Sequence, residues 1–286
     1  MQNSKSILVL GARGLIGSAL MEQLADREAY GLDRPECDVT KPDEVVRTLE
    51  KLRPAVAINA TGFTDVDGSE ARPGEAAELN GEVPGILARA CGQADCLLVH
   101  LSTDFVFDGA SKRPYREDDL PNPLSVYGRT KLAGEEAVRK EGRDWLMVRI
   151  GWVFGPHGRN FVQTILKLAN ENNELNVVND QTGCPTYSLD VSRGIIQLIE
   201  SGARGTFHLA NSGQTTWFGL AQKALSLAGV NNVIVHPITS RELDRPAQRP
   251  AYSVLDTTRF QHITNSGLRT WEEALSAFLK RGELNG

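Results

Sequence analysis

The chain has 286 residues, which is long enough for one large domain or two unequal ones around a sizeable core. Its composition, 41% hydrophobic and 23% charged, is that of an ordinary globular protein, and a net charge of −5 without a block of basic residues disfavours nucleic acid as a partner. No apolar run approaches the roughly 20 residues of a membrane span, and the polar start Met1–Ser6 does not resemble a secretory signal. The four cysteines form no CxxC pair and lie near no histidine-rich segment, so we expect reduced thiols in a cytoplasmic protein without a membrane partner.

The first predicted unit is a strand, a glycine-rich turn and a helix. An apolar strand over residues 6–10 is followed at once by Gly11-Ala-Arg-Gly-Leu-Ile-Gly17, and a helix is predicted from about Leu15 to Ala25. Glycines at this spacing let the backbone approach a pyrophosphate, whose charge is stabilised at the helix N-terminus. A plain tight turn is the alternative, but the position in the first strand–helix unit favours a dinucleotide cofactor.

The end of the second predicted strand, residues 29–32, bears on the choice of cofactor. Asp33 follows it, and an acidic residue here usually accepts a hydrogen bond from the ribose 2′-hydroxyl of NAD. Arg34 comes next, and an arginine accommodates the 2′-phosphate of NADP; Arg13 in the glycine turn is placed to reach the same phosphate. We expect NADPH as the preferred cofactor and NADH as an alternative, although Arg34 alone is equally interpreted as a solvated surface residue.

The next two units continue the strand–helix pattern. Thr40 suits a helix N-cap and Pro42 the first turn of a helix that runs to about Leu52, while Asp38 and Val39 are expected near the adenine end of the cofactor. A third strand over residues 55–59 ends in a stretch through which the central part of the cofactor is expected to pass, namely Ala60, Thr61, Gly62, Phe63 and Thr64.

A helix over about residues 75–91 follows that stretch. It contains Pro84, which implies a kink or a break. It also contains Asn80, for which we expect a structural hydrogen bond opposite the next helix.

The most reactive set of side chains lies between residues 101 and 131. A buried parallel strand over residues 96–101 places Thr103 and Asp104 at its carboxyl end, where reactive groups of such sheets lie. A long loop, residues 108–123, is expected to border the substrate. The following helix, about residues 124–140, carries Tyr127 and Lys131 one turn apart on the same face.

These four side chains fit the reduction of a ketone. Hydride transfer to a carbonyl requires one proton on its oxygen, which Tyr127 would donate while Thr103 hydrogen-bonds the same oxygen. A phenol has a pKa of about 10, and we expect the adjacent Lys131 ammonium to lower the pKa of Tyr127 toward the working range. Because Tyr-x-x-x-Lys also arises by chance, this interpretation depends on the glycine motif upstream.

The regular alternation loosens in the second half of the chain. A strand over residues 145–150 leads to Trp152, which is either a core plug or a face for a sugar ring. Helices are expected over residues 160–169, 188–200, 215–228 and 271–280, and extended segments over 175–178, 205–210 and 233–238. We predict an α/β fold with a doubly wound parallel Rossmann sheet in residues 1–150 and a smaller, mainly substrate-binding α/β lobe in residues 151–286, interleaved with late Rossmann elements.

Several motifs resemble the extended short-chain dehydrogenase/reductases, and within them the dTDP-4-dehydrorhamnose reductase family, over nearly the full chain. The motifs are Gly11-Ala-Arg-Gly-Leu-Ile-Gly17, Asn59-Ala60, Leu101-Ser-Thr-Asp-Phe-Val-Phe107, Tyr127-Gly-Arg-Thr-Lys-Leu-Ala-Gly-Glu135, Asp180-Gln-Thr-Gly-Cys-Pro-Thr186 and Arg249-Pro250. The third and fourth are the most specific. The resemblance implies reduction of dTDP-4-dehydro-L-rhamnose to dTDP-L-rhamnose by NADPH or NADH.

The resemblance also implies roles for individual residues. Thr103, Tyr127 and Lys131 take the catalytic triad positions, and Asp104 would hold or protonate the sugar. Substrate contacts are expected from Val66, Trp152, Asn160, Phe161, Gln181 and Arg249, the last four near the nucleotide diphosphate. Cofactor contacts are expected from Gly11, Arg13, Gly14, Leu15, Ile16, Gly17, Asp33, Arg34, Asp38, Val39, residues 60–64, Tyr127 and Lys131.

Some members of this family form a metal-linked dimer through an acidic residue just after the glycine motif. Ser18 and Ala19 stand there in this chain, so we expect no metal and either a monomer or a weak homodimer. His157 has no obvious metal partner and is expected on a surface loop.

Two other functions stay open at this point. The regulatory β subunit of methionine adenosyltransferase resembles the same family, binds NADP and acts by docking to an enzyme, and such subunits can retain Tyr-x-x-x-Lys. An epimerase or dehydratase of another nucleotide sugar would need a tightly retained NAD and further acid–base residues. Trp152 and the 180–186 segment favour a sugar-nucleotide substrate, while the sequence leaves the sugar and the base undefined.

Overall fold

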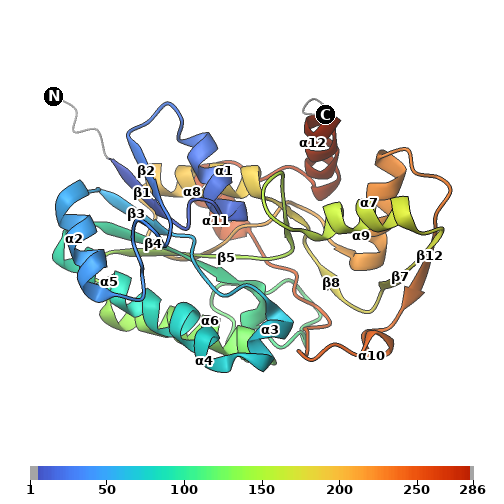
Figure 1. The fold of residues 1–286 in the computed structure, drawn as a ribbon, viewed down its shortest axis with the longest axis horizontal. Coiled ribbons are helices and arrows are strands. Elements are labelled where there is room, and N and C mark those ends of the chain that lie inside the picture. The colour runs from blue at the N-terminus through green and yellow to red at the C-terminus, as the bar shows by residue number, and fades with distance from the viewer. Residues whose placement is uncertain (1–5, 284–286) are drawn as a thin grey trace.

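A parallel sheet of six strands forms the larger half of the molecule (Figure 1). The computed structural model describes residues 6–283, and the strands of this sheet are β1 (Ile7–Leu10), β2 (Ala29–Leu32), β3 (Val56–Asn59), β4 (Leu97–Thr103), β5 (Trp145–Ile150) and β10 (Gly205–His208). Their order across the sheet is β10-β5-β4-β3-β1-β2. The chain moves outward from β1 in both directions, so the sheet is doubly wound as predicted, and a ligand is expected beyond its carboxyl edge beside β1.

Successive residues of each strand point to opposite faces, and each face has its own apolar core. Ile7 and Val9 pack with α1 (Leu15–Gln23), α8 (Ser188–Glu200) and α11 (Thr258–Thr264). Leu8 and Leu10 pack with α2 (Pro42–Leu52), α5 (Val83–Gln93) and α6 (Val126–Glu141). Figure 1 shows these two groups of helices on opposite sides of the sheet.

The helix expected over residues 75–91 changes its hydrogen-bonding pattern just before its proline. The observed elements are α3 (Val66–Ala71), α4 (Pro73–Ala77), a π-helical turn η1 (Glu78–Glu82) and then α5. Pro84 is the second residue of α5, where its missing N–H removes no hydrogen bond of that helix. The expected kink or break takes the form of a π-helical turn directly before the proline-containing turn, and the backbone stays helical from Pro73 to Gln93.

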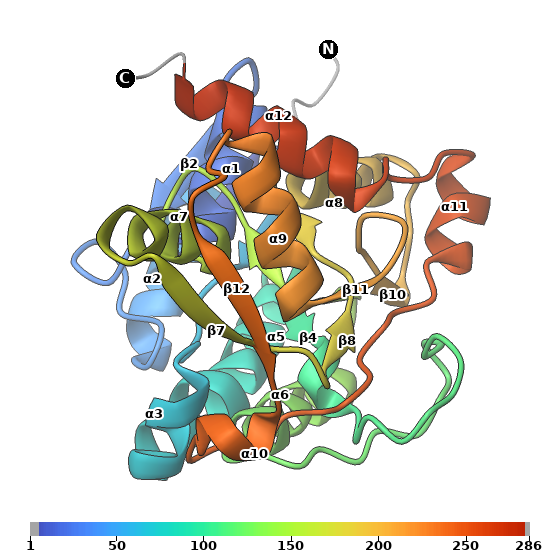
Figure 2. The ribbon, with the colours of Figure 1, turned by 90° about the vertical axis from the view of Figure 1, so that its right-hand side faces the viewer.

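The smaller lobe contains three short strand pairs and four helices (Figure 2). β6 (Val153–Phe154) pairs with β9 (Thr186–Tyr187), β7 (Glu174–Val178) with β12 (Ile234–Ile238), and β8 (Thr182–Gly183) with β11 (Thr215–Thr216). The helices are α7 (Phe161–Glu171), α9 (Trp217–Leu227), α10 (Ser240–Leu243) and α12 (Trp271–Glu283). α7 and α9 cover the β7–β12 pair through an apolar cluster that includes Ile165, Leu175 and Leu225.

Some local expectations were wrong or incomplete. Lys41, not Thr40, is the N-cap of α2, because the Thr40 hydroxyl donates instead to Asp38 Oδ1 at 2.8 Å. The short elements α3, α10, α11 and the two-residue strands were not predicted, since such short segments show no hydrophobic period.

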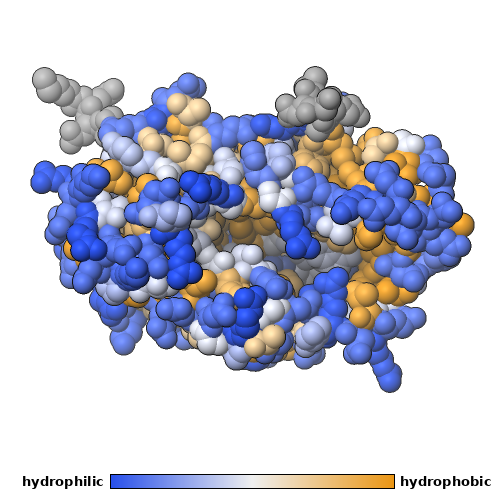
Figure 3. All heavy atoms as spheres, in the orientation of Figure 1, coloured by the Kyte–Doolittle hydropathy of each residue, from blue (hydrophilic) through white to orange (hydrophobic). Residues whose placement is uncertain are grey.

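No helix within residues 6–283 is both long and apolar enough to cross a membrane. On the face drawn in Figure 3, the surface is hollowed near the middle, where apolar residues lie deep between hydrophilic rims.

Candidate active site

The carboxyl end of β4 turns sharply and presents two polar side chains. A single turn of 3₁₀-helix, η2 (Asp104–Val106), begins directly after the strand. The Thr103 hydroxyl accepts a hydrogen bond from the Phe105 N–H at 3.2 Å and donates to Asp104 Oδ1 at 3.1 Å. Both side chains are buried, so the turn holds a hydroxyl and a carboxylate in a fixed relation at the predicted edge of the sheet.

Asp104 is a buried carboxyl group with unused hydrogen-bonding capacity. Burial raises its pKa to about 6, although polar contacts with Ser253 and Thr103 oppose that effect. Gly151 makes room for it, because a Cβ added at residue 151 would stand 2.5 Å from Asp104 Cγ. Within the described residues Asp104 Oδ2 is buried without a hydrogen-bond partner, an unmet requirement that calls for an explanation.

The start of α6 brings Tyr127 to the same turn. Ser125 caps the helix by accepting a hydrogen bond from the Gly128 N–H at 3.1 Å. A Cβ at Gly128 would stand 2.3 Å from the Phe105 carbonyl oxygen, so a glycine is needed where α6 meets η2. The Tyr127 ring meets Phe105 edge to face at 5.6 Å between centroids. The structure thus brings Thr103, Asp104 and Tyr127 together, as the sequence predicted.

The expected effect of Lys131 on Tyr127 is wrong for this arrangement. Burial raises the pKa of Tyr127 to about 12, opposed by a hydrogen bond with Thr103 and reinforced by the charge of Asp104. Lys131 Nζ instead donates to the Leu101 carbonyl oxygen at 2.6 Å. Burial lowers the pKa of Lys131 to about 8, with Glu135 opposing. The Lys131 ammonium group therefore binds the backbone of β4, and the Tyr127 phenol stays protonated at neutral pH.

A buried ion pair between Glu135 on α6 and Arg149 on β5 lies one helical turn beyond Lys131, and the Glu135 charge favours the ammonium form of Lys131. The sequence analysis did not identify this pair. Glu135 Oε1 and Oε2 accept hydrogen bonds from Arg149 on β5 at 2.8 and 2.7 Å, and the Ser102 hydroxyl donates to Oε1 at 2.6 Å. Although burial raises the pKa of Glu135, its contacts with Arg149 and Ser102 outweigh that effect and lower it to about 2. Tyr127, Lys131 and Glu135 are each four residues apart, a spacing that could have indicated this role.

The glycine turn between β1 and α1 fits the pyrophosphate of a dinucleotide. Gly11 has φ +81°, and a Cβ there would stand 2.9 Å from the Ala60 carbonyl oxygen. A Cβ at Gly17 would stand 2.0 Å from the Gly11 carbonyl oxygen, so α1 packs directly on the turn. Gly14 caps α1 without a side-chain hydrogen bond, which leaves N–H groups of the first turn free for an anion.

Charged side chains surround the place expected for the adenosine ribose. Asp33 Oδ1 and Oδ2 accept hydrogen bonds from the Arg13 N–H at 3.3 and 3.2 Å, and the Arg13 guanidinium lies 3.3 Å from Glu36 Oε1. Arg34 Nε donates to Asp38 Oδ2 at 3.2 Å. Glu36, which also accepts a hydrogen bond from the Asp33 N–H, was not singled out from the sequence. Each predicted arginine is therefore balanced by a carboxylate.

The stretch after β3 is fixed by Asn80 of η1, which lies opposite α6 as expected. The Asn80 side chain accepts from the Phe63 N–H at 2.9 Å, donates to the Phe63 carbonyl oxygen at 3.0 Å and reaches the Thr130 hydroxyl at 3.3 Å. The predicted structural hydrogen bond is confirmed. It holds residues 60–64 along the edge of the sheet, and Val66 begins α3 immediately beyond them.

Three of the predicted substrate residues meet in the smaller lobe around a residue that the sequence analysis did not single out. The Trp152 indole stacks on Trp217 with ring centroids 3.6 Å apart and planes within 2°. Phe161 lies 4.6 Å from the same Trp217 ring, and Gln181 Oε1 accepts a hydrogen bond from Trp217 Nε1 at 3.1 Å. Trp152 has φ +51°, a left-handed conformation that costs a bulky residue roughly 1–2 kcal/mol.

The other two predicted nucleotide contacts have partners within the protein. Asn160 is the N-cap of α7: its Oδ1 accepts from the Gln163 N–H at 3.1 Å, and its amide donates to the Gly155 carbonyl oxygen at 2.8 Å. Arg249 donates to both carboxylate oxygens of Asp67 on α3 at 3.0 and 2.8 Å. Arg245 also lies 3.6 Å from Asp67. Arg249 therefore stands between the two halves of the molecule.

Two further features lie away from these residues. His157 is partly exposed and its Nε2 lies 3.9 Å from Glu22 Oε2, while residues 6–283 contain no group of three His, Cys, Asp or Glu side chains placed to hold a metal.

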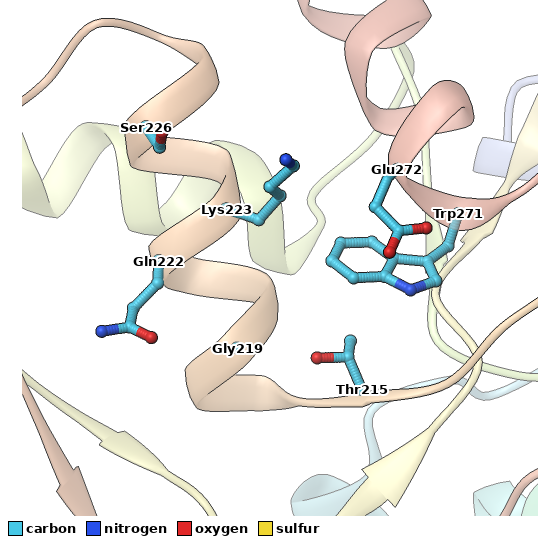
Figure 4. A pocket seen from close by; sticks show the side chains of 7 residues that line it. All are labelled: Thr215, Gly219, Gln222, Lys223, Ser226, Trp271 and Glu272. Carbon is cyan, nitrogen blue, oxygen red and sulfur yellow. The ribbon is translucent and has the colours of Figure 1, made fainter.

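An open depression of about 350 Å³ lies between α9 and α12, with Lys223 and Glu272 on facing walls (Figure 4). The residues that line it are Thr215, Gly219, Gln222, Lys223, Ser226, Trp271 and Glu272, so it shares none with the predicted sites.

The whole chain matches known proteins. A model of the RmlD substrate binding domain matches residues 5–284, and a dTDP-4-dehydrorhamnose reductase from Streptomyces griseus is 40% identical over 94% of this chain and 91% of its own length. The chain belongs to the dTDP-4-dehydrorhamnose reductase family. Members of this family are NAD(P)H-dependent oxidoreductases.

Two other relatives are a solved structure with bound NADP and a ketoreductase named for a different substrate. The crystal structure of a dTDP-4-dehydrorhamnose reductase from Bacillus anthracis in complex with NADP has a TM-score of 0.94 and 32% identity, and it covers 97% of this chain and 99% of that one. A probable dTDP-4,6-dihydroxy-2-methyloxan-3-one 4-ketoreductase from Streptomyces antibioticus is 38% identical over 94% of this chain and 92% of its own length. Relatives named for different substrates are thus similar to this chain to nearly the same degree.

Proposed function

We propose that this protein reduces the 4-keto group of dTDP-4-dehydro-L-rhamnose to give dTDP-L-rhamnose, with NADPH as the preferred and NADH as an alternative cofactor. The observation that carries the proposal is the approach of Thr103, Asp104 and Tyr127 at the carboxyl end of β4, on the same edge of the sheet as the glycine turn that follows β1. Its support from comparison is a family match over almost the entire chain, together with the NADP bound in the Bacillus anthracis relative.

The proposed chemistry assigns one task to each side chain of the set. When bound, the reduced nicotinamide supplies the hydride that converts the ketone carbon to an alcohol. Tyr127 donates its proton to the carbonyl oxygen, and a pKa of about 12 keeps the phenol protonated and ready for that step at neutral pH. The Thr103 hydroxyl hydrogen-bonds the same oxygen, the Asp104 carboxyl group holds the sugar, and Lys131 fixes the end of β4 that carries Thr103 through its hydrogen bond to the Leu101 carbonyl oxygen.

We also propose a division of labour along the chain. Residues 1–150 hold the cofactor, and residues 151–286 mainly hold the substrate through Trp152, Phe161, Gln181 and Arg249. Location in the cytoplasm and a monomeric or weakly dimeric state remain predictions from the sequence.

The Streptomyces antibioticus relative supports a second substrate class within the same chemistry. A reductase that acts on the 4-keto group of another dTDP-linked deoxysugar would use the same proton donor and the same cofactor site. The two candidates differ only in the configuration and substitution of the hexose ring, which the smaller lobe contacts.

The test is loss of NADPH absorbance at 340 nm by the purified full-length protein with freshly prepared dTDP-4-dehydro-L-rhamnose, compared with a second dTDP-4-keto-6-deoxyhexose. We expect faster turnover of the first and dTDP-L-rhamnose as the product. Faster turnover of the second sugar would favour the alternative substrate. No oxidation of NADPH by a protein that binds it would contradict both and favour a regulatory subunit.

A further inference from the structure

Trp152 is held in a position that its own backbone disfavours. Its φ of +51° lies in the left-handed region, which is a genuine outlier for a bulky side chain and persists only where surrounding contacts fix it. The preceding residue is Gly151, where an added Cβ would stand 2.5 Å from Asp104 Cγ. The strained residue is therefore one position from the predicted catalytic set, and its orientation depends on what contacts the indole.

The contacts of the indole come from the smaller lobe. Trp217, the first residue of α9, stacks on it with parallel rings and centroids 3.6 Å apart. Gly183 on β8 also lies against the ring, since a Cβ there would stand 2.3 Å from Trp152 Cε2. Because both contacts are close, rotation of the indole would require Trp217 or β8 to move.

Trp217 is itself fixed at three points. Its Nε1 donates to Gln181 Oε1 at 3.1 Å, and the Gln181 amide donates to Ser240 Oγ on α10 at 2.7 Å. Thr216 caps α9 by accepting from the Gly219 N–H at 3.1 Å, so the backbone of Trp217 is locked at the helix start. Phe161 on α7 packs against its ring. Trp217 thus connects three predicted substrate residues, although no motif pointed to it.

We propose that Trp217 is a positioning residue that holds Trp152 in the orientation that receives the hexose ring of the sugar nucleotide. This inference rests on the proposed function, because the hexose is the occupant assigned to Trp152. Trp217 acts through the indole that it supports and does not contact the substrate. Trp152 lies two residues beyond the end of β5, and Gly151 between them lies beside Asp104, so the stack links the smaller lobe to the site of reduction. Pre-organised aromatic surfaces bind more tightly because less ordering remains to be done on binding.

The experiment is a double-mutant cycle with Trp217→Ala, Trp152→Ala and the double variant. Two quantities are measured for the full-length protein: KM for the keto-sugar and for NADPH during turnover, and Kd for dTDP-L-rhamnose by calorimetry with saturating NADP⁺. We expect Trp217→Ala to weaken KM for the sugar and Kd by about threefold to tenfold, the usual range for an aromatic pair, with KM for NADPH unchanged. Trp217→Phe, which keeps a ring in the stack, should restore most of the loss.

The double variant distinguishes positioning from direct contact. If Trp217 acts only through Trp152, the double variant binds dTDP-L-rhamnose no more weakly than Trp152→Ala alone. Additive losses would overturn the proposal, because Trp217 would then touch the ligand or act through Trp152-independent packing. Equal losses for sugar and NADPH would also overturn it, since they indicate general destabilisation of the fold.

A neighbouring aromatic residue provides the matched control. Phe218, the next residue of α9, packs toward the cluster under β7 and β12 and makes no ring contact with Trp152 within the described residues. Phe218→Ala should leave both sugar constants within about twofold, so a larger loss would contradict a role specific to Trp217. Because Kd is read without turnover, a protein that binds the product but reduces neither sugar would refute the proposed function while the cycle still decides the role of Trp217.

Discussion

At the scale of single residues, burial of the Asp104 carboxyl group lowers the free energy of unfolding when that group is ionised. Its carboxyl group is buried with one oxygen unpaired, and burial is the main cause of its pKa of about 6. A carboxyl group with a raised native pKa binds its proton more tightly in the folded than in the unfolded state. Ionisation of Asp104 therefore opposes folding above pH 6, and this opposition fades as the pH falls toward 4. Such a cost is typical of residues retained for function.

Asp104→Asn should therefore stabilise the protein at pH 8. The shift from an unfolded pKa near 4 to about 6 corresponds to at most about 3 kcal/mol in the free energy of unfolding. Urea unfolding of both proteins at pH 8 and pH 4.5 would show a gain that is several times smaller at the lower pH. A gain of equal size at both values would contradict the assignment of the raised pKa to burial of the charge.

Tyr127→Phe should remove the proton donor while keeping the ring that packs on Phe105. General acid catalysis by a positioned side chain contributes about 10²–10⁴-fold, so kcat should fall by that factor. NADPH affinity, measured by fluorescence titration, should change little. A variant that retains wild-type kcat would show that another group, such as Asp104, supplies the proton.

At the scale of elements, the β1–α1 turn and the end of β2 form one unit for cofactor choice. Arg13 in the turn is paired with Asp33 and Glu36 beyond β2, and Arg34 is paired with Asp38. A 2′-phosphate gains from the arginines and is repelled by the carboxylates, whereas a 2′-hydroxyl needs only one acceptor. The preference for NADPH or NADH thus depends on the balance of charges between two neighbouring turns.

Arg13→Ala and Glu36→Gln should shift cofactor preference in opposite directions. Because exposed ion pairs contribute up to about 1 kcal/mol, the ratio of kcat/KM for NADPH over NADH should fall about threefold to fivefold in the first variant and rise by a similar factor in the second. Arg27→Ala, which removes an exposed arginine paired with Glu200, is the control. Shifts in the same direction, or none, would refute this role for the pair.

At the scale of the whole molecule, two connections join the halves. β10 and α8 come from the second half of the chain, yet they complete the sheet and cover it. The segment that carries Arg249 returns to α3, where Arg249 and Asp67 form a bidentate ion pair. Although burial opposes it, the contacts with Arg249 and the Ala247 N–H lower the pKa of Asp67. This ion pair therefore stabilises the contact between the two halves while Asp67 is ionised.

A double-mutant cycle of Asp67→Ala and Arg249→Ala should give a coupling of about 1 kcal/mol in the free energy of unfolding at pH 7, allowing for the partial exposure of Asp67. The sign of its pH dependence follows from the lowered pKa: the coupling is present above the unfolded pKa of about 4 and is lost as the pH falls below it. Arg72 and Glu75, an exposed pair within one segment, should couple by less than about 0.5 kcal/mol. A coupling no larger than this control would mean that the pair does not hold the halves together.

The sequence alone was sufficient for features with a local cause. Alternation and apolar runs placed the strands of the sheet within two residues of their observed bounds, because a buried parallel strand needs a short continuous apolar segment. The Gly11–Gly17 spacing identified a turn where added side chains would collide with the backbone. The adjacency of Thr103 and Asp104, and the one-turn separation of Tyr127 and Lys131, follow from strand and helix geometry once the elements are known.

Only the tertiary structure decided the features that join distant segments. Glu135 with Arg149, Trp152 with Trp217, and Asp67 with Arg249 are pairs whose members lie far apart in the chain or on different elements. The raised pKa of Tyr127 likewise reversed the expected shift, because burial outweighs a charge that points elsewhere. Local sequence patterns report backbone geometry and hydrophobic period, whereas burial and partner choice arise when segments pack, so those properties could be read only from the folded chain.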